Sequence, residues 1–552
     1  MRAGRLLFGV IAGVAAGDLV LGLNPHLFAP LAAGRLLVVF ALAGGILSTP
    51  FLLASGSAAR PSPLRPVLLA LLCVSYGLFV EGQRTLHYGL LRNGARRVLV
   101  ATSIVSAVVA VLSLCRARWR GVPARPLAWT VLMLFLLPPL FARRAPEGAL
   151  LASPTPLPRA SRRSLLVVGL EGVSWDLISA GASDGSLPVL ARLLKEGSAG
   201  SLGSPRPYDR AALWTTAATG KLPVKHGVVS SQAWPTLAGE LRLLPRLPGA
   251  SATASLPLSP GRPSGGEARR SLSFWEILAR RGHEVALLNW PASHPAQEGL
   301  VLWASERAFE GAASAGAALP LRAAEQALLF RVDVATLDRP LVRTLRPEGL
   351  TSADDRRAPL EGAARDLSVL GAALVTVPAG PGSVSALVLS GAAGVARRFG
   401  SAGNGGYWGV SPPDPEAEAR ALKAYYRFLD DAVGELLERE GRDRTICVFS
   451  PVSYGPPPAL DAFASFVRGR APGASPESSR DGFLVLCGSG IRAGVRLTSA
   501  NVLDLAPTLL VLAGEPLARD FDGRVLAEAF DERFTESASV PIITTFEPKG
   551  PQ

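Results

Sequence analysis

The sequence predicts a doubly wound α/β domain preceded by a transmembrane helical bundle of about five helices. Two observations carry this prediction. Long apolar runs are concentrated before residue 145, and their lengths approach the roughly 20 residues that cross the hydrocarbon layer of a membrane. After residue 163, short continuous apolar runs alternate with amphipathic stretches, as buried strands alternate with helices in a parallel sheet. At 552 residues, the chain is also long enough for two parts.

Five apolar runs make up the N-terminal part, and they occupy residues 6–23, 36–54, 66–80, 98–114 and 126–142. The third run is short, and the first carries Asp18. No small-residue cleavage pattern follows the first run, so we expect a retained helix and not a signal peptide. Positive charges in the loops do not decide the orientation. With an odd number of spans and the N-terminus inside, we expect a multi-pass integral membrane protein whose globular domain is extracytoplasmic.

Composition changes divide the chain into four parts. We assign residues 1–145 to transmembrane helices, 146–163 to a Pro-, Ser-, Ala- and Arg-rich linker, 164–535 to the globular domain and 536–552 to a C-terminal tail. Within the globular domain, residues 237–270 are rich in Pro, Gly and Ser and predict a loop insertion. Residues 307–374 are rich in Ala, Leu and Arg and predict a helical insertion that caps the site.

The net charge of +13 does not indicate a nucleic-acid partner. The positive residues are nearly all Arg and are spread over the whole length, with many in short loops between apolar runs. An Arg-rich membrane protein accounts for this distribution more simply than a nucleic-acid surface does. We therefore expect the lipid bilayer, and no nucleic acid, among the partners.

The globular part begins with a continuous apolar run over residues 164–170, which predicts a strand buried on both faces. The run ends at Glu171, which places a carboxylate where open α/β sheets keep their ligands. A helical pattern follows over 187–196 and stops at Gly197.

Three motifs in this part are specific. They read VVGLEGVSWD at 167–176, LPVLARLLKEG at 187–197 and WTTAATGKLPVKHG at 214–227. In this order and spacing they resemble the type I phosphodiesterase and nucleotide pyrophosphatase branch of the alkaline phosphatase superfamily. The resemblance extends over roughly residues 164–530, and it implies an alkaline-phosphatase-like fold for that region.

The resemblance also implies a chemistry. Enzymes of this superfamily use two metal ions, usually zinc, held by Asp and His, together with a Ser or Thr nucleophile. Position by position, the first metal-binding Asp corresponds to Glu171 and the nucleophile to Arg210. A guanidinium group is always protonated and cannot attack phosphorus. Thr215, Thr216 and Thr219 lie nearby, but in the family's pattern they belong to the following helix.

The other metal positions of the family also lack ligands. They correspond to Ala393, Arg397, Pro451, Val452 and Ser478, and we regard all of these as vestigial metal positions. Beyond the membrane part the only histidines are His226, His283 and His294, which cannot hold two zinc ions in the usual way. We therefore expect no metal cofactor and no confident catalytic residue.

Two arginines stand where the family has a nucleophile and a ligand, and they suggest a replacement for the metals' charge. The guanidinium groups of Arg210 and Arg397 either pair internally with Glu171 or receive an anionic ligand such as a phosphate headgroup. Internal pairing is the favoured alternative, because burial of an unpaired carboxylate costs several kcal/mol.

Three functional interpretations follow. The first is a membrane-anchored pseudoenzyme, a phosphodiesterase-like protein that has lost metal-dependent hydrolysis and serves as a binding or scaffolding module. The second is an active metal-dependent phosphodiesterase or phosphotransferase with a rearranged site, which the resemblance would direct to lipid or polymer headgroups of the cell envelope. The third makes the membrane half the working part and the globular domain its regulator. The sequence does not identify the ligand, the protein partners or the oligomeric state.

Overall fold

The structure is a computed structural model of the chain. It describes residues 2–27, 30–54, 64–87, 91, 93–118, 124–141, 163–206, 208–237, 239–245, 261–263, 265–310, 316–350, 352–376, 378, 380–400, 414–440, 444–467, 473–476, 481–537 and 540–548. The chain divides into two compact units. The helical unit contains residues 1–148, 232–248 and 254–263, and the α/β unit contains 149–231, 249–253 and 264–552. The predicted linker, 146–163, lies outside the described residues except for its last residue.

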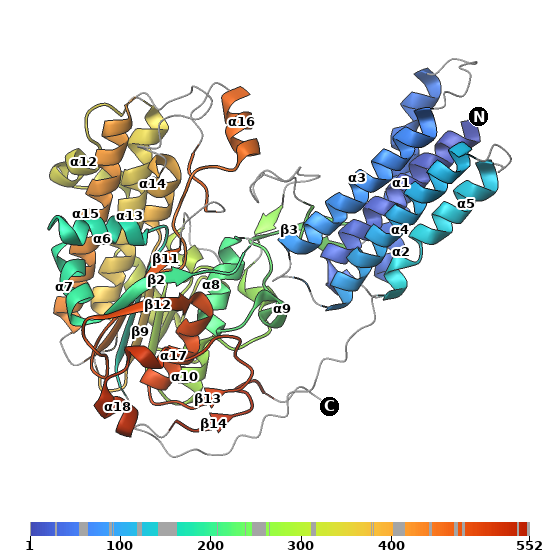
Figure 1. The fold of residues 1–552 in the computed structure, drawn as a ribbon. Coiled ribbons are helices and arrows are strands. Elements are labelled where there is room, and N and C mark those ends of the chain that lie inside the picture. The colour runs from blue at the N-terminus through green and yellow to red at the C-terminus, as the bar shows by residue number, and fades with distance from the viewer. Residues whose placement is uncertain are drawn as a thin grey trace. The chain divides into compact units, whose positions relative to one another are not determined.

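The helical unit has a helix at each of the five apolar runs. They are α1 (Arg2–Leu23), α2 (Pro30–Ala54), α3 (Leu64–Leu86), α4 (Asn93–Arg118) and α5 (Ala124–Phe135). Figure 1 shows them as long rods in blue and cyan. Among the described residues, one stretch, Gly94–Cys115 within α4, is both long and apolar enough to cross a membrane.

The helical unit also includes a hairpin from the middle of the chain. Strand β3 (Gln232–Thr236) pairs antiparallel with β4 (Gly239–Leu241) and with β5 (Arg262–Pro263). The range 237–270, which the sequence predicts as a loop insertion, contains β4 and β5 where the structure describes it. Strands β4 and β5 have only three and two residues. So few alternating residues give little periodic signal in a stretch rich in Pro and Gly.

A mixed nine-stranded sheet forms the centre of the α/β unit, in the order β12-β2-β11-β10-β1-β9-β6-β7-β8. Strand β1 lies between β9 and β10 and is parallel to both. Strand β11 is antiparallel to its neighbours β10 and β2, so the sheet is not wholly parallel. The strands are β1 (Leu165–Leu170), β2 (Ser198–Gly203), β6 (Val285–Leu288), β7 (Leu302–Ala304), β8 (Ala318–Leu319), β9 (Val384–Leu389), β10 (Thr445–Ser450), β11 (Gly482–Gly488) and β12 (Val495–Asn501).

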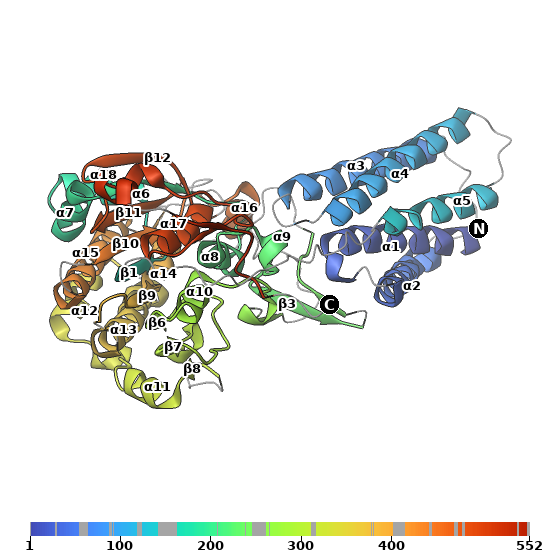
Figure 2. The same ribbon diagram turned by 90° about the horizontal axis from the view of Figure 1, so that it is seen from below.

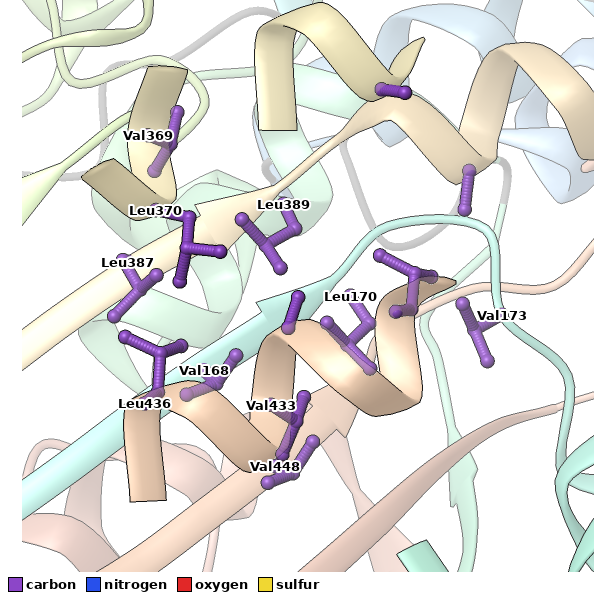
Figure 3. Close-up of a cluster of buried hydrophobic side chains, with 14 of the residues drawn as sticks. Val168, Leu170, Val173, Val369, Leu370, Leu387, Leu389, Val433, Leu436 and Val448 are labelled. Carbon is purple, nitrogen blue, oxygen red and sulfur yellow. The ribbon is translucent and has the colours of Figure 1, made fainter. Parts of the chain in front are cut away.

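Helices cover both faces of this sheet, as a doubly wound arrangement requires. Alternate residues of β1 divide between two cores: Leu166 and Val168 belong to one, and Leu165 and Val167 to the other. The first core contains α7 (Pro188–Glu196), α11 (Leu321–Leu328), α13 (Ala353–Thr376), α14 (Gly391–Phe399) and α15 (Pro415–Glu440), and part of it is drawn in Figure 3. The second contains α8 (Arg210–Thr219), α10 (Phe274–Arg280) and α17 (Leu505–Leu512), which Figure 2 shows on the opposite side of the sheet.

The helix predicted at 187–196 corresponds to α7. The helices of the α/β unit are α6 (Trp175–Ser183), α7 (Pro188–Glu196), α8 (Arg210–Thr219), α9 (Pro223–His226), α10 (Phe274–Arg280), α11 (Leu321–Leu328), α12 (Arg339–Leu345), α13 (Ala353–Thr376), α14 (Gly391–Phe399), α15 (Pro415–Glu440), α16 (Ala459–Val467), α17 (Leu505–Leu512) and α18 (Glu532–Ser537).

The insertion at 307–374 is helical, as expected, but its longest helix is a core element and not only a cap. Helix α13 buries Leu360, Val369 and Leu370 in the core on the sheet. The described part of the tail 536–552 is also ordered against the unit. There β14 (Ile542–Ile543) pairs with β13 (Leu517–Ala518).

Candidate functional site

The predicted site positions gather at one edge of the sheet. Strands β1, β9 and β10 are parallel neighbours, so the residues that follow their carboxyl ends lie close together. Glu171 follows β1, and the turn after it contains Gly172 at φ +91°. A Cβ atom at Gly172 would lie 2.8 Å from Cα of Ala393 and 3.1 Å from the Tyr454 ring. This turn therefore packs against the start of α14 and the loop after β10.

Glu171 forms a bidentate ion pair with Arg210. Nε of Arg210 donates to Oε1 of Glu171 at 2.6 Å, and Nη2 donates to Oε2 at 2.8 Å. The Glu171 side chain is 1% exposed and that of Arg210 is 34% exposed. Both carboxylate oxygens thus accept from one guanidinium, which is the strongest common form of this contact. The geometry matches the internal-pairing alternative for Arg210.

The ion pair keeps the Arg210 guanidinium charged. Burial opposes the charged form, but the carboxylate of Glu171 outweighs it, through its charge and its hydrogen bonds, and raises the pKa of Arg210. Two of the three nearby threonines have structural hydrogen bonds within their own helix. The hydroxyls of Thr216 and Thr219 donate to the carbonyls of Ala212 and Thr215 within α8.

Asp209 and Ser231 fix the first turn of α8, which begins at Arg210. Oδ1 of Asp209 accepts from the backbone N–H of Ala212 at 3.1 Å, as an N-cap does. The Ser231 N–H donates to Oδ2 of Asp209 at 2.9 Å, and its hydroxyl donates to Oδ1 at 2.9 Å. The Ser231 hydroxyl also accepts from Ala211 N–H at 3.0 Å. The position of Arg210 is therefore set by four hydrogen bonds.

Arg397 differs from Arg210 in having no carboxylate partner. It lies on α14 with an exposed side chain, and no carboxylate in the described part of the chain forms an ion pair with it. Its neighbour Arg398 instead pairs with Asp355. Contact with Tyr454 is the main cause that raises the pKa of Arg397, and Tyr208 and Glu171 act in the same direction. Within the described part of the chain, the Arg397 guanidinium therefore has no directly paired carboxylate, although the charge of Glu171 acts on it.

Three further positions that the resemblance assigns to metal binding, Ala393, Pro451 and Val452, have side chains without a metal-binding group. Ala393 lies in α14, and Pro451 and Val452 are buried after β10. Val452 takes part through its carbonyl, which accepts from the Ser450 hydroxyl at 2.7 Å. Ser478 lies outside the described residues.

The sequence reasoning missed three residues of this cluster, namely Tyr208, Tyr454 and Glu306. Glu306 follows β7 and accepts from N–H and Oγ of Ser293 at 3.0 and 3.1 Å. Burial raises its pKa, while the charge of Arg210 acts to lower it. The available signal was the short apolar run at 300–304 that ends two residues before it, since carboxyl ends of parallel strands share one edge of the sheet.

The donor set does not fit the two zinc ions that the resemblance implies. Both carboxylate oxygens of Glu171 are engaged with Arg210, a permanent cation that a metal ion would have to displace. Over the described ranges, no three His, Cys, Asp or Glu side chains are grouped so as to hold a metal ion. We therefore derive no step through a metal.

The histidines have structural partners. His283 lies between the carbonyl of Gly382 at 2.9 Å and the carboxylate of Glu515 at 3.0 Å. His226 is fully buried; its Nδ1 accepts from Val228 N–H at 3.2 Å, and its Nε2 lies 3.1 Å from the Thr216 hydroxyl. Because Nδ1 accepts, the ring is the neutral tautomer with its proton on Nε2.

We expect His226 to make stability depend on pH. Burial, helped by the charge of Arg269, lowers the pKa of His226 from 6.5 to about 3. Between these values the unfolded chain binds a proton that the folded chain does not, so stability falls as the pH is lowered through this window. The His226→Gln variant should show a slope smaller by about 1.4 kcal/mol per pH unit between pH 6 and 4. Unfolding free energies of both proteins measured across this range test the prediction, and equal slopes would contradict it.

The chain is similar to known proteins in sequence over part of its length and to several solved structures. A family model described as type I phosphodiesterase / nucleotide pyrophosphatase matches residues 165–450. No curated protein matches the chain. Among solved structures, the chain is similar to wild-type alkaline phosphatase PafA, at 12% identity and TM-score 0.43 over 68% of this chain and 100% of that one. Murine ectonucleotide pyrophosphatase/phosphodiesterase 5 matches at 10% identity and TM-score 0.38, over 67% and 100% of the two chains. A phosphonate monoester hydrolase from Silicibacter pomeroyi matches at 15% identity and TM-score 0.39, over 66% and 76%.

Proposed function

Since this chain belongs to the type I phosphodiesterase / nucleotide pyrophosphatase family, we propose that it is a membrane-anchored member that has lost metal-dependent hydrolysis and serves as a binding module. The observation that carries the proposal is the bidentate pair between Arg210 and Glu171. Arg210, whose guanidinium cannot act as a nucleophile, stands at the position that the family resemblance implies for the nucleophile. The same guanidinium donates to both carboxylate oxygens of Glu171, which would otherwise be available to a metal ion.

The ligand of this module is a phosphate-type anion, such as a phosphorylated headgroup. Arg397 supports this assignment, because its exposed guanidinium has no carboxylate partner in the described chain and lies in contact with Tyr454. Arg210 uses two of its five N–H groups on Glu171, so its guanidinium also directs positive charge at the site. Guanidinium groups bind phosphate oxygens through charge-assisted hydrogen bonds.

The membrane anchor is the helical unit. The stretch Gly94–Cys115 is long and apolar enough to span a bilayer, and α1 and α2 are 22 and 25 residues long. We propose that all five helices of the helical unit cross the membrane and that the α/β unit lies on the extracytoplasmic side. Substituted-cysteine labelling from either side of intact cells, at positions in the α/β unit, tests the orientation.

Loss of Arg397 should weaken anion binding. We expect Arg397→Ala to raise the Kd for inorganic phosphate by about tenfold, because one hydrogen bond to a charged group contributes about 1.5 kcal/mol or more. Titration calorimetry on the full chain in detergent measures this. Arg398→Ala is the matched control, since its guanidinium is already paired with Asp355, and it should leave the Kd unchanged. Equal effects of the two substitutions would reject Arg397 as the anion ligand.

Activity and metal content test the loss of hydrolysis directly. We expect the purified full chain to contain no stoichiometric zinc and to show no turnover of an aryl phosphate or an aryl phosphodiester above the background rate. Stoichiometric zinc, together with turnover that Glu171→Ala abolishes, would overturn the proposal in favour of an active phosphodiesterase or phosphotransferase.

A further inference from the structure

Glu306 is a second carboxylate at the edge of the sheet that holds the candidate site. It follows β7, which is parallel to β6, and β6 is in turn parallel to β9, the neighbour of β1. The carboxyl ends of these strands therefore share one edge. Glu306 lies two residues beyond the end of β7, and Glu171 lies directly after β1. Both belong to the α/β unit.

Hydrogen bonds fix the carboxylate of Glu306, but they do not neutralise its charge. Its Oε2 accepts from the backbone N–H of Ser293 at 3.0 Å and from the Ser293 hydroxyl at 3.1 Å. Among the described residues, Arg210 is the cation whose charge acts on Glu306, and that guanidinium is already paired with Glu171. Burial raises the pKa of Glu306, as expected for a carboxylate without a paired cation of its own.

The charges that act on one another at this edge cancel when Glu306 is ionised. The two guanidinium groups of Arg210 and Arg397 are accompanied by the carboxylates of Glu171 and Glu306. The charge of Glu171 acts on both arginines, and that of Glu306 acts on Arg210. An anion that binds here is attracted by the guanidinium groups and repelled by Glu306. This repulsion grows in proportion to the charge of the anion.

We propose that Glu306 is a specificity-determining residue, which restricts the site to tetrahedral oxyanions that carry a single negative charge. The inference rests on the proposed function, since it takes the binding of a phosphate-type anion at Arg397 as given. It narrows the ligand class from phosphorylated groups in general to singly charged ones. A doubly charged group, such as a terminal phosphate monoester, is disfavoured because Glu306 repels each of its charges.

Methyl sulfate and sulfate are matched probes, because both are tetrahedral oxyanions and the first is singly charged while the second is doubly charged. In Glu306→Gln we expect the affinity for methyl sulfate to rise about threefold and that for sulfate about tenfold, since the second charge doubles the logarithm of the change. The amide oxygen of Gln accepts the same hydrogen bonds from Ser293, so the charge is removed and the contacts are kept.

Titration calorimetry on the full chain in detergent measures both affinities. It is done at about pH 8, because burial raises the pKa of Glu306 and the test requires the ionised carboxylate. Glu284→Gln is the matched control, since Glu284 is exposed and directly precedes β6, at the opposite edge of the sheet. It removes an equal charge and should change neither affinity. Glu306→Ala removes the charge without supplying an amide and repeats the test if Glu306→Gln does not fold.

Equal changes in the two affinities, or a decrease in both, would refute the role of Glu306. Arg397→Ala, titrated with the same probes, separates this failure from failure of the proposed function. If Arg397→Ala weakens binding while Glu306→Gln leaves the ratio of the two affinities unchanged, only the inference about Glu306 is wrong. If Arg397→Ala has no effect, or if neither probe binds to the wild type or to Glu306→Gln, the proposed function fails and this inference fails with it.

Discussion

Arg210→Ala should destabilise the folded chain by about 3 kcal/mol, because it leaves a buried carboxylate without its partner. Glu171 is 1% exposed and both of its oxygens accept from Arg210. Removing one member of a buried ion pair typically costs about 3–5 kcal/mol, and the one-third exposure of Arg210 places this pair near the lower limit. Denaturant or thermal unfolding of the full chain, followed by tryptophan fluorescence, measures the change.

A double substitution separates the unpaired charge from lost packing. Glu171→Gln combined with Arg210→Met removes both charges, and we expect most of the stability lost in Arg210→Ala to return. The control is Arg357→Ala, since Arg357 and Glu361 form an exposed pair on α13 at 73% and 50% exposure. Exposed pairs of this kind contribute about 0–1 kcal/mol. If Arg357→Ala lowers the free energy of unfolding as much as Arg210→Ala does, the prediction that the buried Glu171 pair contributes more than an exposed pair is wrong.

Trp214→Ala should cost about 3–5 kcal/mol, the range for truncation of a buried Trp or Phe. Trp214 is fully buried on α8, with ring centroids 5.3 Å from Trp290 and 5.5 Å from Phe449. A Cβ atom at Gly169 would lie 2.6 Å from the Trp214 ring, so β1 carries a glycine where this ring approaches the sheet. No neighbouring side chain is able to fill the resulting cavity without leaving its own packed position.

The same unfolding measurement decides this prediction. Trp175→Ala is the matched control, because Trp175 is only partly buried at the edge of the other core, and its removal should cost clearly less. A loss below about 1 kcal/mol in Trp214→Ala would show that the aromatic cluster is not tightly packed around this ring.

Local sequence patterns predicted most of the fold. The strand at 164–170 and the helix at 187–196 differ from β1 and α7 by one residue each, because buried strands and amphipathic helices leave distinct periodicities. The ordered motifs at 167–176, 187–197 and 214–227 gave the family, which the match over 165–450 confirms. The same motifs predict that Glu171 and Arg210 stand at the family's metal-ligand and nucleophile positions.

These local patterns did not predict which distant parts of the chain contact one another. Short strands such as β4, with three residues, carry too little periodicity to be distinguished from a loop. The antiparallel direction of β11 is also not encoded locally, since a strand buried on both faces has the same apolar pattern in either direction.

The sequence by itself determined the family, and it predicted the division of the chain and the replacement of the family's site residues, because each depends on residue identity and local order. Only the tertiary structure decided that Arg210 pairs with Glu171, while no carboxylate among the described residues forms an ion pair with Arg397. It alone placed Asn24 against Leu243, 219 positions away. Side-chain pairing across such separations depends on how strands and helices are packed, and no local pattern specifies that packing.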